Sequence, residues 1–130
     1  MNNIMKGKMG ENYATEYLIS KGYDILERNF RCKLGEIDII GEIEDLIVFF
    51  EVKSRTSNYY GYPYEAVNWK KQNKIIKTSL FYMKMNKLAN IQFRFDILEV
   101  YLGKSLKINH IENAFCQKWM ENKGFYVLPR

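Results

Sequence analysis

The chain has 130 residues, which is the length of one ordinary globular domain and too short for two well-cored domains. Its residues are 47% hydrophobic and 27% charged, a balance that is typical of a folded protein and argues against an intrinsically disordered chain. The formal net charge of +5 favours anionic partners, such as nucleic acid or a membrane surface, but carries no information about the fold. We therefore expect residues 1–130 to form a single domain.

The sequence also disfavours three classes of protein. The longest apolar run, residues 46–50, is far shorter than the ~20 residues that a bilayer-spanning helix needs. The N-terminus has no apolar segment of the kind found in secretory signals. Two cysteines without CxxC spacing and a single histidine disfavour a zinc site and exclude a His-rich one. We expect a cytoplasmic protein with reduced thiols and no membrane partner, in which any metal ion is held by carboxylates.

Hydrophobic periodicity predicts a helix followed by three strands in the first half of the chain. The helix spans residues 8–21, where apolar side chains recur at helical spacing. The strands are predicted over residues 23–31, 36–43 and 46–53. Because only Glu44-Asp45 separates the last two strands, they are expected to form a tight hairpin.

A second, longer helix is predicted over residues 64–86, with Pro63 in position for its first turn. Its apolar residues share one face, and its lysines lie on a neighbouring face. The apolar face comprises Trp69, Ile76, Leu80 and Met83, and the lysine row comprises Lys70, Lys74, Lys77 and Lys84.

Two more strands are predicted over residues 91–101 and 106–111. The last stretch is ambiguous, and one interpretation is a short helix over 114–122 followed by an apolar tail over 125–128. The resulting order is α-β-β-β-α-β-β. It predicts an α/β fold in which a mixed five-stranded sheet is flanked by helices.

Charged residues occur where two of the predicted strands should bury apolar ones. Period-two alternation places Glu36 and Asp38 on one face of their strand and the neighbouring isoleucines on the other. In the next strand Glu51 and Lys53 share a face. A hairpin closed at residues 44–45 pairs Asp38 with Glu51 and Glu36 with Lys53, and directly opposed residues project to the same side. The four side chains are therefore expected in one patch, which a register slip of one residue would scatter.

This patch has the parts of a metal-dependent hydrolase. Opposed carboxylates repel unless a cation compensates, and Mg²⁺ binds through one or two carboxylates, waters and substrate phosphate. Lys53 could position or deprotonate the attacking water, or neutralise charge on the phosphate. Glu11 is a further candidate acid, because it lies at the rim of the buried helical stripe, seven residues before Leu18. The set suits phosphodiester hydrolysis with Mg²⁺ or Mn²⁺.

A plainer interpretation is that these charges are solvated surface positions. Glu36 and Lys53 could form a simple cross-strand ion pair, worth at most ~1 kcal/mol. The apolar run that leads into Glu51 favours the functional interpretation, because so apolar a strand is normally interior to a sheet.

Several other residues are candidates for binding nucleic acid. Arg55 and the lysine row, chiefly Lys70, Lys74 and Lys77, could contact phosphates, although a solvated helix face is slightly favoured for the lysines. The tyrosines of the predicted loop over 54–63, notably Tyr59 and Tyr60, could stack on unpaired bases or simply pack the loop. Asp96 and His110 are interpreted as structural residues.

Spaced motifs run through residues 8–116. They include Gly10-Glu11, Gly22-Tyr23, Gly35-Glu36-Ile37-Asp38, Phe50-Glu51-Val52-Lys53, Lys71, Arg94-Phe95-Asp96 and His110-Ile111. Together they resemble the YraN-like family of small bacterial proteins, and residues 117–130 form an extension beyond the family pattern.

The resemblance implies a function by analogy. The YraN-like family is placed in the PD-(D/E)xK nuclease superfamily, near the archaeal Holliday-junction resolvases. The resemblance therefore implies a restriction-endonuclease-like core, with Asp38, Glu51 and Lys53 in the catalytic positions and Glu11 as the helix-borne acid. The segment Glu36-Ile37-Asp38 replaces the Pro-Asp pair of the superfamily and leaves the aspartate in place.

The leading hypothesis is a Mg²⁺- or Mn²⁺-dependent DNA endonuclease, selective for branched or flapped DNA. Its metal ligands would be Asp38, Glu51 and the backbone carbonyl of Val52. A homodimer would suit the two-fold symmetry of a branched junction. The alternatives are an accessory module that binds nucleic acid with little catalysis, a phosphohydrolase acting on small substrates, and RNA in place of DNA.

Overall fold

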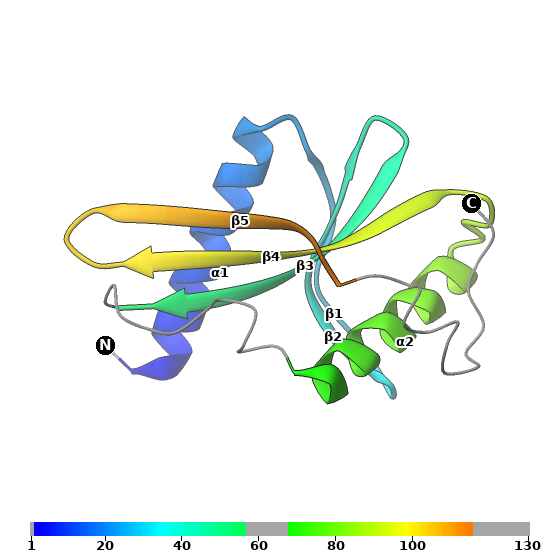
Figure 1. Ribbon diagram of the computed structural model, residues 1–130, viewed down its shortest axis with the longest axis horizontal. Helices are drawn as coiled ribbons and strands as arrows, with labels where there is room; N and C mark the ends of the chain where they lie inside the picture. Colours follow the sequence, from blue (N-terminus) through cyan, green and yellow to red (C-terminus); the bar gives the residue numbers. More distant parts are fainter. Residues whose placement is uncertain (1, 57–67, 116–130) are drawn as a thin grey trace.

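A twisted five-stranded sheet forms the centre of the protein, with a helix against each of its faces (Figure 1). The computed structural model describes residues 2–56 and 68–115. The elements in chain order are α1 (Asn3–Ser20), β1 (Asp24–Cys32), β2 (Gly35–Ile43), β3 (Leu46–Arg55), α2 (Trp69–Met85), β4 (Gln92–Leu102) and β5 (Leu106–Phe115). This is the predicted α-β-β-β-α-β-β order, and the α/β class with a mixed five-stranded sheet is confirmed.

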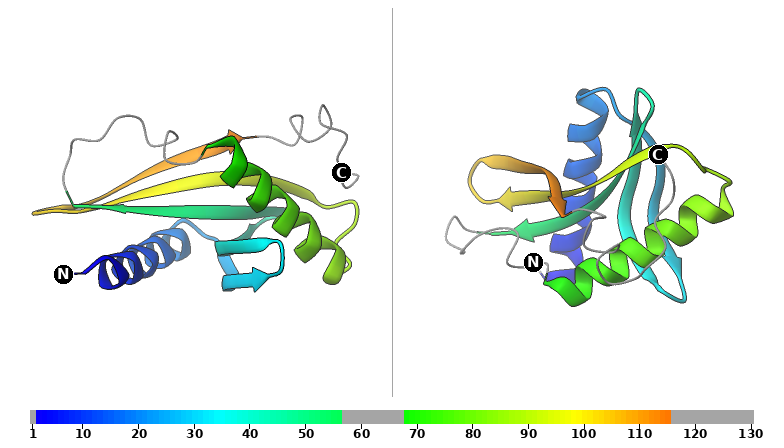
Figure 2. Two further views of the ribbon diagram at one scale, coloured as in Figure 1. Left: turned by 90° about the horizontal axis from the view of Figure 1, so that it is seen from below. Right: turned by 45° about the vertical axis from the view of Figure 1, so that its right-hand side comes forward.

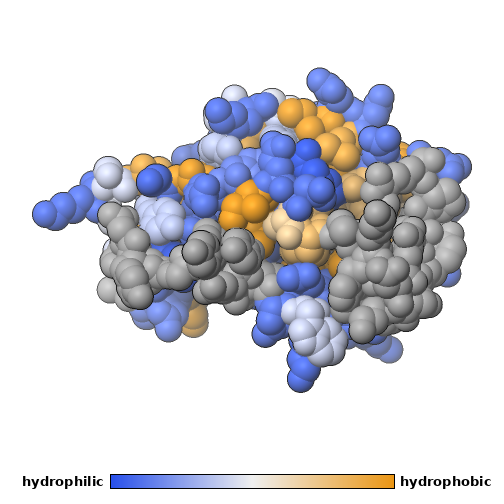
Figure 3. All heavy atoms as spheres, viewed as in Figure 1, coloured by the Kyte–Doolittle hydropathy of each residue, from blue (hydrophilic) through white to orange (hydrophobic). Residues whose placement is uncertain are grey.

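The sheet has the strand order β1-β2-β3-β4-β5, and only β3 and β4 pair in parallel. Parallel neighbours need a crossover connection, and α2 lies in the segment that joins them. The helices cover opposite sides of the sheet, with α1 behind β3–β5 in the view of Figure 1 (Figures 1 and 2). Seen from the same direction, hydrophobic side chains reach the surface near the middle of the face, with hydrophilic ones around them (Figure 3).

Each helix encloses its own hydrophobic core against the sheet. On one face Ala14 and Leu18 of α1 pack with Val48 and Phe50 of β3 in a buried cluster. On the other face the buried residues of α2 pack with a second cluster. That cluster includes Ile75, Ile76 and Met83 of α2 together with Phe49, Phe95 and Ile97 of the sheet. Because side chains alternate along a strand, β3 contributes to both cores, which makes it an interior strand, as its apolar run predicted.

The β2–β3 hairpin has the predicted register as far as its pairing extends. Ile43 faces Leu46 and Ile39 faces Phe50. The paired ladder ends there, so the predicted pairing of Asp38 with Glu51 and that of Glu36 with Lys53 are both wrong. Glu36 instead faces Arg31 of β1, and its Oε2 lies 2.9 Å from the Arg31 Nε.

The predicted face of the isoleucines around Asp38 is also wrong. Ile37 belongs to the core under α2, whereas Ile39 belongs to the core under α1. The two are paired with residues on either side of Asn29, whose backbone is left-handed with φ of 54°. That conformation interrupts the regular alternation of the strand pair, so the period-two rule fails at this position.

The helix boundaries follow their capping residues. α1 begins five residues earlier than predicted, because the Asn2 side chain accepts a hydrogen bond from the Met5 N–H at 2.8 Å. α2 begins at Trp69 rather than 64, because Asn68 is extended and caps the Lys71 N–H at 3.0 Å. Trp69 is 59% exposed and not part of the apolar face, because the buried residues of α2 begin six residues later, at Ile75.

The remaining sequence predictions fall near the ends of the described chain. β5 continues to Phe115, so the helix predicted from residue 114 does not start there. Tyr59, Tyr60 and Pro63, and residues 116–130, lie outside the described residues. Neither helix of the part that is described is long and apolar enough to cross a membrane.

Gly10 sets the closest approach between α1 and the sheet. A Cβ added at Gly10 would lie 1.8 Å from the Ser54 Oγ and 3.0 Å from its Cβ. The helix can therefore approach the end of β3 only because this position has no side chain. The same approach carries the adjacent Glu11 to that end of the sheet.

We expect Gly10→Ala to lower the free energy of unfolding by about 1–3 kcal/mol, because the added methyl group overpacks this contact. Urea denaturation measures the change. Gly7→Ala is the matched control on the same helix, since a Cβ there meets nothing within 4 Å. It should raise the unfolding free energy by up to ~1 kcal/mol through helix propensity. Equal effects of the two substitutions would contradict the close-contact argument.

Candidate active site

The candidate site lies where β2 and β3 separate, just beyond their last paired residues. The Asp38 Oδ2 accepts a hydrogen bond from the Val52 backbone N–H at 2.7 Å. Beyond Ile39 and Phe50 this side chain therefore joins the two strands in place of backbone pairing. It also holds the Asp38 carboxylate beside β3, next to Glu51.

Glu51 is 7% exposed and projects to the face of the sheet that α2 covers, like Phe49 before it. Two lysines approach its carboxylate. The Lys71 Nζ of α2 lies 2.8 Å from the Glu51 Oε1, and the Lys53 Nζ of β3 lies 3.7 Å from the same oxygen. The sequence predicted Lys53 as a site residue but did not assign a role to Lys71. The only signal in the sequence that pointed to Lys71 was its place among the family motifs.

The carboxylates perturb one another as the predicted patch requires. Burial, followed by the negative charge of Glu51, raises the pKa of Asp38 from 3.8 to about 7. The charge of Glu11 raises it further, while the Val52 N–H and Lys71 act in the opposite direction. Near neutral pH this carboxyl is therefore partly protonated unless a cation approaches it.

The two lysines respond differently to the site. Burial and then the hydrogen bond with Lys71 lower the pKa of Lys53, against the attraction of Glu51. Burial alone would also lower the pKa of Lys71, but its hydrogen bonds with Glu51 and Lys53 raise it above the ordinary value. Lys71 is therefore the more firmly charged of the pair.

Glu11 reaches this region from α1, on the opposite side of the sheet from α2. Its Oε1 lies 3.7 Å from a guanidinium nitrogen of Arg28, and its charge acts on Asp38. The structure thus brings Glu11, Asp38, Glu51 and Lys53 into one electrostatically connected region. Glu36 lies apart from it, paired with Arg31.

The oxygen donors here suit a divalent cation only in part. Within residues 2–56 and 68–115 no group of three or more His, Cys, Asp or Glu side chains is arranged to hold a metal ion. Two carboxylates are enough for Mg²⁺, which completes its octahedron with water, carbonyl and phosphate oxygens. The donor set at Asp38 and Glu51 therefore fits a hard cation.

Arg55 is held by a buried carboxylate. Its Nε lies 2.5 Å from the Oε2 of Glu99, a residue with no exposed surface. The Tyr101 hydroxyl donates to the other oxygen of Glu99. If Arg55 contacts a phosphate as predicted, its guanidinium must do so while it remains bonded to Glu99.

The predicted lysine row divides into two groups. Lys70 and Lys74 line a groove beside the site, between the start of α2 and the start of β2. Lys77 lies further along the helix and is not among the residues that line this groove. Of the predicted phosphate-binding lysines, Lys70 and Lys74 therefore share a groove with Lys71, which contacts Glu51.

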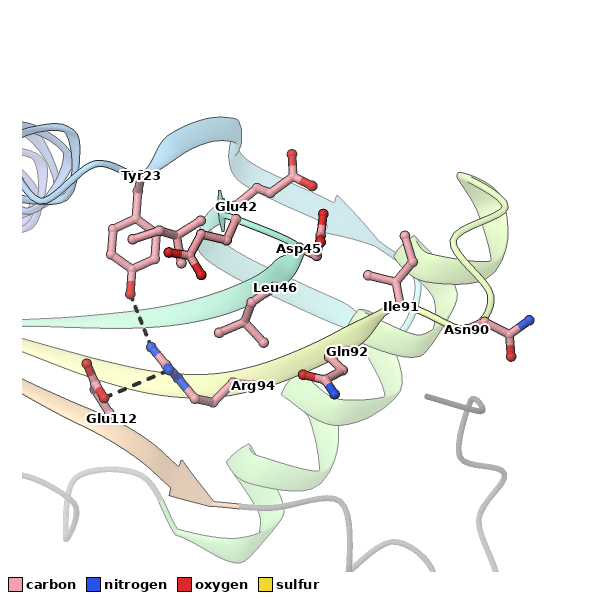
Figure 4. A pocket seen from close by; sticks show the side chains of 11 residues that line it. Tyr23, Glu42, Asp45, Leu46, Asn90, Ile91, Gln92, Arg94 and Glu112 are labelled. Atoms are coloured by element: carbon pink, nitrogen blue, oxygen red, sulfur yellow. Dashed lines mark hydrogen bonds and ion pairs between the residues drawn. The ribbon is translucent and has the colours of Figure 1, made fainter.

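A larger cavity, of about 940 Å³, lies at the closed end of the hairpin, away from these residues (Figure 4). Its lining includes Glu42, Glu44, Asp45 and Glu112. The Arg94 guanidinium there bonds to the Tyr23 hydroxyl at 3.1 Å and lies 3.8 Å from Glu112. An acidic lining repels phosphate, so this cavity is poorly suited to nucleic acid.

Asp96 anchors a buried network that shares Arg94 with that cavity. Arg94 contacts both of its carboxylate oxygens at 2.8 Å, the His110 Nε2 lies 2.7 Å away, and the Asn113 N–H donates at 2.9 Å. Burial alone would raise the pKa of Asp96, but these hydrogen bonds hold it below its ordinary value. Because His110 also contacts the Tyr17 hydroxyl at 3.0 Å, the network joins β4 and β5 to α1, in keeping with the structural roles inferred for Asp96 and His110.

Neutralising Asp38 should stabilise the protein at alkaline pH. With a pKa of about 7 in the folded state and an ordinary value of 3.8, this carboxyl binds more protons folded than unfolded between about pH 4 and 7. Its contribution to stability therefore falls as pH rises through that window. Asp38→Asn keeps the acceptor for the Val52 N–H and should be about 1–3 kcal/mol more stable than the wild type at pH 8.

Denaturant unfolding at pH 8 and pH 4.5 measures this effect, and the gap between variant and wild type should narrow at the lower pH. Glu36→Gln, at an exposed carboxylate, is the control and should show no comparable pH dependence. An Asp38→Asn protein less stable than the wild type at pH 8 would contradict the electrostatic account.

Comparison of the sequence with known proteins shows the family to which the chain belongs. Residues 10–100, which contain every predicted site residue, match the family described as "Uncharacterised protein family UPF0102". A UPF0102 protein of Clostridioides difficile is 54% identical over 115 residues, covering 88% of this chain and all of the relative. Another, from Caldanaerobacter subterraneus subsp. tengcongensis, is 49% identical over 119 residues, covering 88% and 98%. One from Clostridium acetobutylicum is 50% identical over 116 residues, covering 87% and 95%. The chain therefore belongs to the UPF0102 family, which is the YraN-like family that its motifs resemble.

Proposed function

We propose that the protein is a Mg²⁺- or Mn²⁺-dependent DNA endonuclease of the PD-(D/E)xK type. The observation that supports it best is the convergence of Asp38 and Glu51 with Lys53 at the point where β2 leaves β3. These are the residue types that metal-dependent phosphodiester hydrolysis requires, and they come from separate strands.

The chain's own groups have definable roles in this reaction. Asp38, Glu51 and the Val52 carbonyl would hold the cation, and Asp38 is already fixed by the Val52 N–H. A cation bound there supplies positive charge against the phosphate and makes a water more acidic. Water and phosphate oxygens would complete its ligands, as Mg²⁺ prefers.

Lys53 is suited to handle the attacking water. Its pKa is lowered, so a larger fraction of its amine is neutral than in an ordinary lysine, and a neutral amine can accept a proton. Glu11, on the other side of Asp38, would orient a second water or tune a second cation. Because Arg28 lies 3.7 Å from the Glu11 carboxylate, Glu11 would act from a position that Arg28 helps to fix.

The substrate is proposed to be DNA with branched or flapped structure. The net charge of +5 and the lysines beside the site favour a polyanion over a small substrate. The likeness to archaeal Holliday-junction resolvases favours branches, and a homodimer would match the symmetry of a four-way junction.

A second candidate is a nucleic-acid-binding module with the same fold and little catalysis. It is favoured by the lack, in the described part of the chain, of three or more side chains arranged as metal ligands. In that case the two lysines, rather than a cation, would balance Glu51 permanently.

Cleavage of four-way, flapped and duplex DNA in Mn²⁺ and in EDTA distinguishes these functions. We expect nicking in Mn²⁺ only, and a loss of about 10²–10⁴-fold in rate for Lys53→Ala, as for removal of a general acid or base. Because Lys53 is proposed to act in catalysis, the variant should keep most of its DNA affinity in EDTA.

Lys104→Ala is the matched control, since Lys104 is an exposed lysine in the β4–β5 turn, and it should cleave at the wild-type rate. DNA binding by the wild type without cleavage in Mn²⁺ or Mg²⁺ would support the binding module instead. Cleavage unchanged by Lys53→Ala would contradict the role of Lys53.

A further inference from the structure

Lys71 lies between the candidate site and the neighbouring groove. Its ammonium is closer to the Glu51 Oε1, at 2.8 Å, than that of Lys53, at 3.7 Å. The Lys71 side chain is 40% exposed, whereas that of Glu51 is only 8% exposed. The carboxylate is thus fixed and buried, and its nearest positive partner can reach solvent.

The groove that Lys71 also lines is suited to an anion. It has a volume of about 430 Å³, and its lining includes Lys70 and Lys74 of α2, the N-cap residue Asn68, and Gly35 at the start of β2. The first turn of α2 contains no acidic residue, so the positive end of the helix dipole is not offset there. The one carboxylate in the lining, Glu36, is already paired with Arg31.

Glu51 cannot serve Lys71 and a divalent cation equally well. The cation would approach the carboxylate that now bonds to Lys71, and two like charges a few ångströms apart repel. Lysine carries its charge on a flexible four-carbon stem, so its ammonium can move without a change in the backbone. The Lys71 ammonium could then move into the groove lined by Lys70 and Lys74, because a phosphate bound there would attract it.

We propose that Lys71 exchanges partners. Without a divalent cation it neutralises Glu51, and when the cation binds it turns into the groove and binds a backbone phosphate of the nucleic acid. This rests on the proposed cation site at Asp38 and Glu51. It makes Lys71 a positioning residue that couples cation binding to the binding of the nucleic-acid strand.

A purely structural ion pair would behave differently. The loss of a purely structural pair would also free Glu51 for the cation, but it would leave DNA affinity unchanged whether or not the cation is present. Partner exchange instead predicts opposite changes in two affinities when Lys71 is replaced. Cation affinity should rise because a competitor is gone, and DNA affinity should fall only when the cation is present.

The test uses the full-length Lys71→Met protein, which keeps most of the apolar stem and loses the charge. Titration calorimetry with Mn²⁺ alone should show binding about 3–10-fold tighter than that of the wild type. Fluorescence anisotropy with a flapped DNA in Ca²⁺ should show weaker binding, with a salt slope reduced by about 1. In EDTA the DNA affinity of the variant should stay within about 2-fold of the wild type.

Lys70→Met is the matched control, because Lys70 lines the groove while the ion pairs of Glu51 among the described residues are with Lys53 and Lys71. It should weaken DNA binding in Ca²⁺ and in EDTA alike and leave Mn²⁺ affinity unchanged. Lys71→Gln, which keeps a donor for Glu51, serves as a second variant if Lys71→Met does not fold.

Unchanged or weaker Mn²⁺ binding by Lys71→Met, or an equal loss of DNA affinity in EDTA and Ca²⁺, would overturn the exchange. Neither measurement depends on cleavage. If the wild type nicks DNA while Lys71→Met leaves Mn²⁺ affinity unchanged, the exchange fails and the nuclease proposal stands. If the wild type does not bind Mn²⁺, both fail.

Discussion

The hydrogen bond from the Val52 N–H to Asp38 determines the geometry of the whole candidate site. A backbone N–H that loses its strand partner must find another acceptor, and here a carboxylate supplies it. The bond ties the end of β2 to β3 just where their regular pairing stops. It also keeps Asp38 between the two faces of the sheet, where Glu51 approaches from the α2 side and the charge of Glu11 acts from the α1 side.

Buried acids elsewhere in the protein show how unusual the surroundings of Asp38 are. Glu99 is held by Arg55, and Asp96 by Arg94 and His110, so each is matched by a side chain that can carry positive charge. The bond that the structure gives Asp38 is to an amide, which carries no full charge. Burial and then the charge of Glu51 raise the pKa of Asp38, whereas hydrogen bonds with His110 and Arg94 hold the pKa of Asp96 below its ordinary value.

Much of this arrangement is contained in local patterns of the sequence. The element order and the β2–β3 register follow from hydrophobic periodicity and from a two-residue turn, because both are set by neighbours along the chain. The faces of Ile37 and Ile39 were not predictable from alternation, since the left-handed Asn29 that disturbs it lies on a different strand. The pairing of Arg55 with Glu99 depends on the parallel β3–β4 register, which no turn specifies.

The role of Lys71 was missed for a related reason. Its distance to Glu51 depends on how α2 docks against the sheet after a crossover, and periodicity on the helix alone cannot supply that. The prediction that Trp69 lies on the apolar face was wrong on the same grounds, because the pattern gives the azimuth of a side chain but not where the covering sheet ends. Local chemistry was thus predictable, while contacts between elements distant in sequence were not.

Assembly of the site from both sides of the sheet has a consequence for the newly made chain. Glu11 precedes all five strands, whereas Lys71 follows the first three and belongs to the segment that connects β3 to β4. A ribosome-bound fragment that ends before α2 would carry Asp38, Glu51 and Lys53 without the nearest positive partner of Glu51. The nearest positive partner of Glu51 is therefore supplied only after translation has passed the crossover and α2 has docked.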